Sequence, residues 1–131
     1  MSNSAPTVIE RDALFKTFGR AWFKRDVDLL YQAVVPDFVW LGTDPTGLVT
    51  RITGRDAVAA AFAAMSASNT RTQFSDVVYH HAPEATFMTF RIVESDKETG
   101  AVLRDEIGVE RYTFAKGLIA IKDVYRKPSA A

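Results

Sequence analysis

The chain has 131 residues, of which 47% are hydrophobic and 24% charged. This is the composition of an ordinary globular domain, which excludes a chain that is disordered as a whole and a coiled coil. Sixteen basic residues are matched by sixteen acidic ones mixed along the chain, so a nucleic-acid or anionic-membrane surface is not expected. The chain contains no cysteine, which rules out disulfides and thiolate chemistry.

The organisation of the chain is predicted to be simple. Residues 1–7 are small and polar and are not followed by an apolar signal region, so they read as a disordered tail. The longest apolar stretch, residues 57–65, is mostly alanine and too short to span a bilayer. We expect a cytoplasmic protein with one domain over residues 8–126 and a C-terminal tail over residues 127–131.

The first half of the chain has helical signals. Thr7 and Glu10 form a capping-box pattern, and apolar residues then recur at spacings of three and four as far as Trp22. Asp26 can cap a second short helix with Val34 on its buried side, ended by Pro36. A third helix is predicted over residues 55–67.

Strand signals follow these helices and dominate the second half. Runs of β-branched and aromatic residues alternate with turn residues, and Asp44 belongs to one such turn. Short connections predict an antiparallel meander that the first strands join at an edge. This order gives an α+β layout. The predicted strands cover about 38–41, 48–53, 72–80, 86–94, 102–114 and 118–126.

Four short motifs, in this order and spacing, resemble the nuclear transport factor 2-like (NTF2-like) superfamily, which includes the SnoaL-like polyketide cyclases and the ketosteroid isomerases. The resemblance extends from Leu14 to Arg126. The motifs are Lys24–Asp28, Pro36–Trp40, Thr53–Val58 and Gly117–Ile119.

The resemblance implies N-terminal helices packed on a strongly curved mixed or antiparallel sheet, a cone-shaped and cystatin-like fold with a pocket inside. It also implies a small-molecule ligand as partner and a homodimer formed through the outer sheet face. Strand periodicity independently favours a pocket, because Glu106, Gly108, Glu110, Tyr112 and Phe114 share one face of a strand whose other face is also partly apolar.

Glu110 is the first candidate catalytic residue. By the resemblance, it falls where ketosteroid isomerases place a buried carboxylic acid that donates to the substrate oxyanion. The alternative is a charge partner for Arg91 or Arg111. The family's oxyanion-hole tyrosine would fall at Phe18 and its catalytic aspartate near Leu41 or Gly42, so the resemblance itself disfavours steroid isomerase chemistry.

His80 is a second candidate, as a general acid or base. His80 and His81 are adjacent on a predicted strand and therefore point to opposite faces, so at most one of them faces the pocket. A solvated or capping role is the alternative. No cluster has metal-ligand spacing, and no phosphate loop or nucleotide fingerprint is present, so we expect neither a metal nor a cofactor.

Asp123 and Tyr125 form a further candidate pair, with a salt bridge on a dimer-facing sheet as the alternative for Asp123. Arg91 is either a hook for a ligand anion or the counter-ion of a glutamate. An aromatic set is typical of a core and also fits a flat apolar ligand. With one methionine, the remaining ligand-binding candidates are Trp22, Tyr31, Phe38, Trp40, Phe62, Met65, Tyr112 and Phe114.

Three functions fit these patterns. The first is a SnoaL-like pocket protein that binds a small hydrophobic or cyclic molecule. The second is a cofactor-free isomerase, cyclase, dehydratase or hydrolase that uses Glu110 or Asp123 as its acid or base. The third is a dimerisation module with a vestigial cavity. Catalysis predicts polar groups that converge in one cavity, whereas a module predicts a filled cone.

Overall fold

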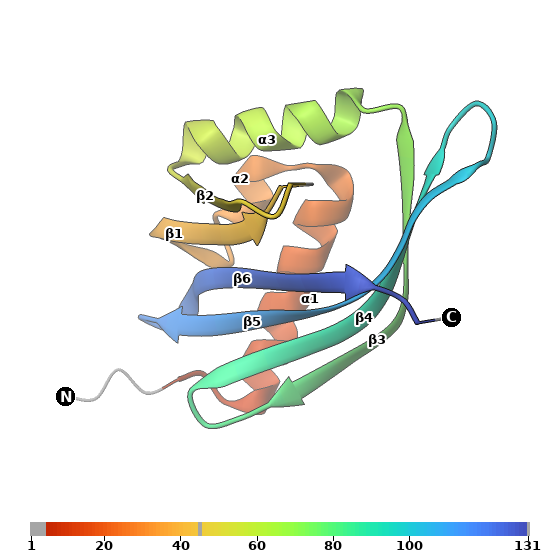
Figure 1. Ribbon diagram of the computed structural model, residues 1–131. Coiled ribbons are helices and arrows are strands. Elements are labelled where there is room, and N and C mark those ends of the chain that lie inside the picture. The colour runs from red at the N-terminus through yellow and green to blue at the C-terminus, as the bar shows by residue number, and fades with distance from the viewer. Residues whose placement is uncertain (1–4, 45, 131) are drawn as a thin grey trace.

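A six-stranded sheet covered by three helices makes up the part of the chain that the computed structural model describes, residues 5–44 and 46–130 (Figure 1). No helix in these ranges is long and apolar enough to cross a membrane. The helices are α1 (Val8–Lys24), α2 (Val27–Leu30) and α3 (Arg55–Ala67), and the strands are β1 (Val34–Thr43), β2 (Val49–Thr53), β3 (Thr70–His81), β4 (Ala85–Asp96), β5 (Val102–Ala115) and β6 (Leu118–Pro128).

The sheet is mixed and has the strand order β2-β1-β6-β5-β4-β3. Strands β3 to β6 form an antiparallel meander, and β1 joins it by pairing in parallel with β6. The sheet curves around α1 and does not close (Figure 1). The predicted fold class, helices on a strongly curved mixed sheet, is therefore confirmed.

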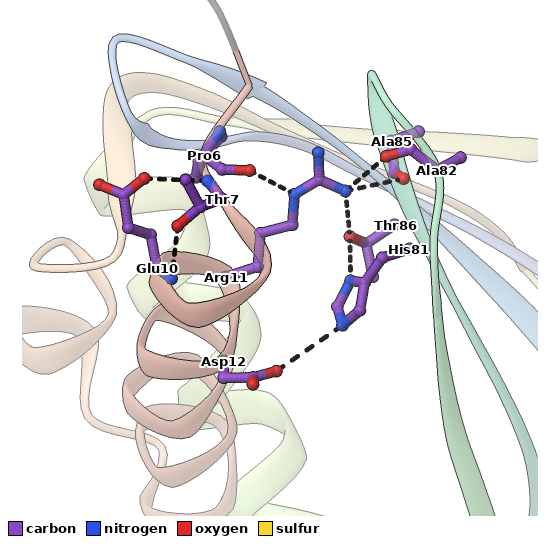
Figure 2. Close-up of polar contacts among 9 residues, drawn as sticks. All are labelled: Pro6, Thr7, Glu10, Arg11, Asp12, His81, Ala82, Ala85 and Thr86. Carbon is purple, nitrogen blue, oxygen red and sulfur yellow. Dashed lines mark hydrogen bonds and ion pairs between the residues drawn. The ribbon is translucent and has the colours of Figure 1, made fainter.

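Helix α1 begins where its capping box predicts. The Thr7 hydroxyl accepts from the Glu10 N–H at 3.2 Å, and the Glu10 carboxylate accepts from the Thr7 N–H at 2.9 Å (Figure 2). Its buried face carries Phe15 and Phe18, whose rings contact Tyr112 on β5 with centroids 4.8 and 5.4 Å apart. Helix α1 therefore covers the concave face of the sheet.

The second helix is shorter than predicted, which corrects the interpretation of Pro36 as a helix stop. Asp26 caps α2 by accepting from the Leu29 N–H, but α2 ends at Leu30 and strand β1 begins at Val34. Pro36 lies inside β1, where the pairing with β6 is interrupted by a register shift. Because proline has no N–H to donate, an irregular stretch of strand is a position that it tolerates.

The β5–β6 hairpin contains a bulge that sets which side chains face the helices. Lys116 and Gly117 both have positive φ, 53° and 78°, as the tight turns preferred in hairpins require. Phe114 pairs with Ile119, but Thr113 pairs with Ile121, so Ala120 is an extra residue on β6. Because of this extra residue, each side chain of β6 after the bulge points to the opposite face of the sheet from the one it would occupy in a regular hairpin.

Strand β6 is also longer than expected. Lys127 pairs with Ile107 and Pro128 with Glu106, and the Ser129 N–H donates to the Asp105 carbonyl at 2.9 Å. The expected domain boundary at residue 126 therefore falls inside a strand. The apolar pattern had ended earlier because this last stretch is exposed and polar.

Gly108 allows close packing on the concave face. A Cβ atom at this position would lie 2.5 Å from Cζ of Phe90 and 2.8 Å from the Tyr125 carbonyl oxygen. Such distances are far below van der Waals contact, so only glycine lets the Phe90 ring lie across β5. Phe90 is buried there and contacts the Phe74 ring of β3, with centroids 5.3 Å apart.

A buried arginine connects α1 to the β3–β4 turn (Figure 2). The Arg11 guanidinium donates to the carbonyls of Pro6 at 2.8 Å, Ala82 at 2.6 Å and Pro83 at 2.8 Å, and to the Thr86 hydroxyl at 3.2 Å. These acceptors satisfy a charge that would otherwise be costly to bury. Arg11 thus fixes the start of α1 on the sheet.

We predict that Arg11→Met destabilises the fold by about 3 kcal/mol, because the variant leaves several part-buried carbonyls without a donor. The exposed Arg20 lies on the same helix, and Arg20→Met is the matched control, with an expected change below about 0.5 kcal/mol. Urea denaturation followed by circular dichroism measures both. Equal effects of the two variants would contradict the role given to Arg11.

Candidate functional site

Two cavities lie between the concave face of the sheet and the C-terminal ends of α1 and α3. The floor cavity has a volume of about 660 Å³ and extends down to Glu110 and Tyr112 on β5. The side cavity, of about 630 Å³, extends towards β1 and β2. Trp22, Met65 and Lys122 line both, so the cavities adjoin at these side chains. Each volume is within the range of small-molecule sites.

Three polar side chains meet at the bottom of the floor cavity, and we call Glu110, Tyr112 and Lys122 the floor cluster. All three are buried, with exposures of 2%, 1% and 5%. The Tyr112 hydroxyl donates to Oε1 of Glu110, and Nζ of Lys122 lies 3.8 Å from the same oxygen. Strand geometry explains the meeting, because positions 110 and 112 share a face of β5 and Tyr112 pairs with Lys122 across the hairpin.

Aromatic rings surround the lysine of the floor cluster. Nζ of Lys122 lies 3.4 Å from the ring centroid of Trp22, 5.3 Å from that of Trp40 and 5.6 Å from that of Phe18. The faces of such rings attract a cation, most strongly where water is excluded. Phe62 on α3 supports Trp22 from behind, with ring centroids 4.9 Å apart. The ammonium group therefore has one carboxylate and several ring faces as its surroundings.

Burial changes the proton affinities of this cluster. Desolvation lowers the pKa of Lys122 to about 8, an effect that the nearby Glu110 charge opposes and the positive charges of Arg126 and Arg25 reinforce. The pKa of Tyr112 is raised well above its usual value, first by burial and then by the Glu110 carboxylate. Near neutral pH the cluster therefore holds a neutral phenol beside an amine that is close to releasing its proton.

A second charged group lies in the side cavity. Nη1 of Arg126 on β6 lies 3.6 Å from Glu94 of β4 and 4.0 Å from Glu106 of β5. Its guanidinium also lies 5.9 Å from the centre of the Phe90 ring. The side cavity is therefore more polar than the aromatic region around Lys122.

The structure brings several predicted site residues together. Glu110, Tyr112, Trp22, Trp40 and Met65 all line one or both cavities. Among them, Trp22 and Trp40 pack edge to face with centroids 4.6 Å apart. The aromatic pocket and the candidate carboxylate thus occupy the same space.

The remaining aromatic candidates lie outside the cavity linings. Phe38 is fully buried in the core, and Phe62 is 2% exposed and contributes through its contact with Trp22. The Arg55 guanidinium lies 5.1 Å from the ring centroid of Tyr31, and the Arg11 guanidinium lies 4.8 Å from the ring centroid of Phe114. These residues support the fold around the site.

Asp123 and Tyr125 lie on the convex face, apart from the floor cluster. The Tyr125 hydroxyl donates to Asp123 at 2.7 Å in an exposed contact. In a regular hairpin, Asp123 would have paired with Glu110 and shared its face. The extra residue Ala120 instead pairs Val124 with Glu110 and turns Asp123 outwards.

Arg91 also projects from the convex face, because its neighbours Phe90 and Ile92 are buried on the concave one. It forms a two-pronged ion pair with Asp105, with N–O distances of 3.0 and 2.6 Å. Its partner is therefore an aspartate of β5 rather than Glu110.

The two histidines do separate to opposite faces. Nε2 of His80 lies 3.1 Å from the Thr89 hydroxyl on the convex side. His81 faces α1, with Nδ1 at 2.9 Å from the Thr86 hydroxyl and Nε2 at 3.6 Å from Asp12 (Figure 2). Neither imidazole lines the floor cavity or the side cavity.

Lys122 is a site residue that the sequence did not single out, although it lines both cavities. The sequence did contain a signal for its burial, because Lys122 shares a largely apolar face of the predicted strand with Ala120 and Val124. Asp44, in contrast, has the turn role expected of it, because its carboxylate accepts from the N–H groups of Thr46 and Leu48.

Comparisons with known proteins identify the fold. No protein-family model matches the chain, and no curated protein matches it. Among solved structures, an NTF2-like protein from Burkholderia xenovorans LB400 is 17% identical, with a TM-score of 0.76 over 92% of each chain. An NTF2-like protein of unknown function from Burkholderia pseudomallei K96243 is also 17% identical, with a TM-score of 0.71 over 90% of this chain and 91% of that one.

An LEH-like epoxide hydrolase from M. tuberculosis is 15% identical, with a TM-score of 0.67 over 93% of this chain and 81% of that one. At such identities the similarity is one of fold, and fold alone does not assign an activity. The chain has the NTF2-like fold, as the resemblance of its motifs predicts.

We predict that Lys122 makes stability rise with pH between about 8 and 10. The folded lysine loses its proton above about 8, whereas the unfolded one keeps it to about 10.5, so the unfolded chain binds more protons in this window. Relative to Lys122→Met/Glu110→Gln, which removes both buried charges, the unfolding free energy should gain about 2 kcal/mol between pH 8 and pH 10.

Urea denaturation at several pH values measures this difference. Lys116→Met, at an exposed turn position, is the control and should follow the unmodified protein. Parallel curves for the unmodified protein and the double variant would show that Lys122 has an ordinary pKa.

Proposed function

We propose that this protein binds a small hydrophobic or cyclic molecule in the floor cavity, with a polar group of the ligand directed at the floor cluster. The observation that carries the proposal is the convergence of Glu110, Tyr112 and Lys122 at the bottom of a cavity whose lining also includes several aromatic rings. A cavity of about 660 Å³ is large enough for such a ligand. The volume of this cavity argues against the alternative of a dimerisation module with a vestigial cavity, for which a filled cone is predicted.

The chemistry of the cavity limits the ligand. The ring of Trp22, which lines the floor cavity, and that of Trp40, which lines the adjoining side cavity, offer flat apolar surface, which suits a cyclic or aromatic body. The Lys122 ammonium group supplies hydrogen-bond donors at the closed end. We therefore propose a ligand with one oxygen acceptor, such as a carbonyl or hydroxyl group, at one end of an apolar body.

A second candidate function is cofactor-free acid–base catalysis, as in an isomerase, cyclase, dehydratase or hydrolase. It is favoured by a carboxylate, a phenol and an amine within one water-poor site, since acid–base catalysis needs a proton acceptor and a donor at the same substrate. Glu110 would accept a proton and Lys122 would return one. The epoxide hydrolase with this fold makes a hydrolase one form of this proposal.

Asp123, His80, Arg91 and Tyr125 take no part in the proposed cavity chemistry. On the convex face, His80 contacts Thr89, Arg91 pairs with Asp105, and Tyr125 donates to Asp123.

We also propose a cytoplasmic location, because the chain has no cysteine that could form a disulfide in an oxidising compartment.

Ligand binding can be followed through the two tryptophans of the chain, because both line the cavities. We predict that 2-naphthylmethanol shifts the two indole N–H signals in a saturable manner in a ¹H–¹⁵N NMR titration. Met65→Phe narrows the cavity and should weaken this binding by about tenfold or more. Ile9→Phe, at an exposed site on α1, is the control and should bind unchanged. Unshifted indole signals at saturating probe would refute the proposed function.

We further propose that the protein forms a homodimer through its convex sheet face. A groove of about 520 Å³ crosses this face, and its lining combines apolar residues, among them Ile107, Val109 and Tyr125, with charged ones. Ile107 and Tyr125 are 38% and 57% exposed, and their grouping in one groove gives the face a contiguous apolar patch. The occupant that we propose is the same face of a second copy, as the family resemblance implies.

Analytical ultracentrifugation tests the dimer. We predict a dimer for the unmodified chain and a monomer for Ile107→Arg, because two unpaired charges would be buried at a symmetric interface. Ile9→Arg places the same charge on the exposed side of α1 and should leave the dimer intact. A monomer at all concentrations for the unmodified chain would refute this interface.

A further inference from the structure

Lys122 differs in its surroundings from an ordinary surface lysine. It is 5% exposed, and its Nζ faces the two cavities instead of bulk solvent. One carboxylate oxygen, Oε1 of Glu110, lies 3.8 Å away, and the Trp22 ring lies 3.4 Å from Nζ. A buried amine at the end of a ligand-sized cavity, with a proton acceptor beside it, has the arrangement of a nucleophile.

We propose that Lys122 forms a Schiff base with a hydrophobic aldehyde or ketone bound in the floor cavity. The inference rests on the proposed binding function and makes it more specific, because it names carbonyl compounds as the substrate class. The geometry that supports it is the position of Nζ at the meeting point of both cavities, with Glu110 on one side and aromatic rings on the other.

The step balances without any co-reactant. The ammonium group of Lys122 first gives a proton to the Glu110 carboxylate, and the neutral amine then attacks the carbonyl carbon. A C–N bond forms while the C=O π electrons move to oxygen, which takes up the proton held by Glu110. The nitrogen loses a second proton to the same oxygen, water leaves, and a protonated iminium remains. One positive charge is present before and after the reaction.

The site suits both ends of this reaction. Because the iminium carries the same charge as the ammonium, it keeps the attraction of Glu110 and of the Trp22 ring face. The Tyr112 hydroxyl, which donates to Glu110, can hold that carboxylate in place during the proton transfers. Because Lys122 is only 5% exposed, water has limited access to its nitrogen, which favours the iminium over its hydrolysis.

Burial of the amine favours its reactive, neutral form. Desolvation lowers the pKa of Lys122 to about 8, so near neutral pH its neutral fraction exceeds that of a lysine with an ordinary pKa on the order of a hundredfold. The ionisable groups that line the same cavities come from six elements or their ends: Lys24 and Arg25 at the end of α1, Asp44 after β1, Tyr79 on β3, Glu94 and Lys97 at the end of β4, Arg104, Asp105, Glu106, Glu110 and Tyr112 on β5, and Arg126 on β6.

Reductive trapping tests the proposal directly. The full-length protein is incubated at pH 7.5 with 2-naphthaldehyde and sodium cyanoborohydride, which converts an iminium into a stable secondary amine. Peptide mapping by mass spectrometry then locates the label. We expect Lys122 to be labelled at least tenfold faster than the exposed Lys116 of the β5–β6 turn. Because both lysines are compared in the same unmodified chain, this result does not depend on whether a variant folds.

Variants show how the site acts. Lys122→Arg keeps the charge but cannot form an iminium, and should abolish the fast labelling, whereas Lys116→Arg should not affect it. Glu110→Gln removes the proton acceptor and should slow the labelling of Lys122 by about tenfold. Circular dichroism is recorded for each variant, and only folded variants are compared.

The alcohol 2-naphthylmethanol separates the inference from the proposed function, since it has the shape of the aldehyde but no carbonyl group. If the alcohol shifts the indole signals while the label spreads evenly over the exposed lysines, the Schiff base is refuted and the binding function stands. If the alcohol does not bind and Lys122 is not labelled, both are refuted. Fast labelling confined to Lys122, together with shifted indole signals, supports both.

Discussion

A single extra residue in the β5–β6 hairpin determines the chemistry inside this protein. Because Ala120 is bulged out of the ladder, Lys122 rather than Ile121 lies opposite Tyr112, and Val124 rather than Asp123 lies opposite Glu110. Without the bulge, two carboxylates would share the concave face with no cation between them. With it, a carboxylate, a phenol and an ammonium group meet beneath α1.

Burial of these groups opposes folding, and their mutual contacts offset that cost. An isolated buried charge destabilises a protein by several kcal/mol, whereas a pair with further hydrogen bonds can be nearly neutral. Here Glu110 is paired with Lys122 and accepts from Tyr112, and the ring of Trp22 covers the ammonium group. The floor cluster therefore contributes little to the free energy of unfolding. Groups that are buried without a gain in stability are typical of functional sites.

Local physics predicted much of the fold from the sequence. The capping box at Thr7 and the composition of residues 55–67 gave helices α1 and α3 with their observed starts, because both signals depend only on residues next to one another in the chain. Residues whose placement depends on the register between strands were misjudged. Of the two roles considered for Asp123, the structure excludes the one in the pocket, and Arg91 pairs with an aspartate where a glutamate or a ligand anion was considered. A bulge and a contact with Asp105 across strands leave no local sequence signal.

The account depends on Lys122 being a buried amine beside Glu110, and an NMR titration of the lysine side chains measures this most directly. With ¹³C-labelled lysine, the Cε signal of each lysine reports its own pKa. The account predicts one signal that titrates near pH 8 and is missing in Lys122→Arg. A set of lysine signals that all titrate near pH 10.4 would contradict it, because Lys122 would then be exposed to solvent as an ordinary surface residue.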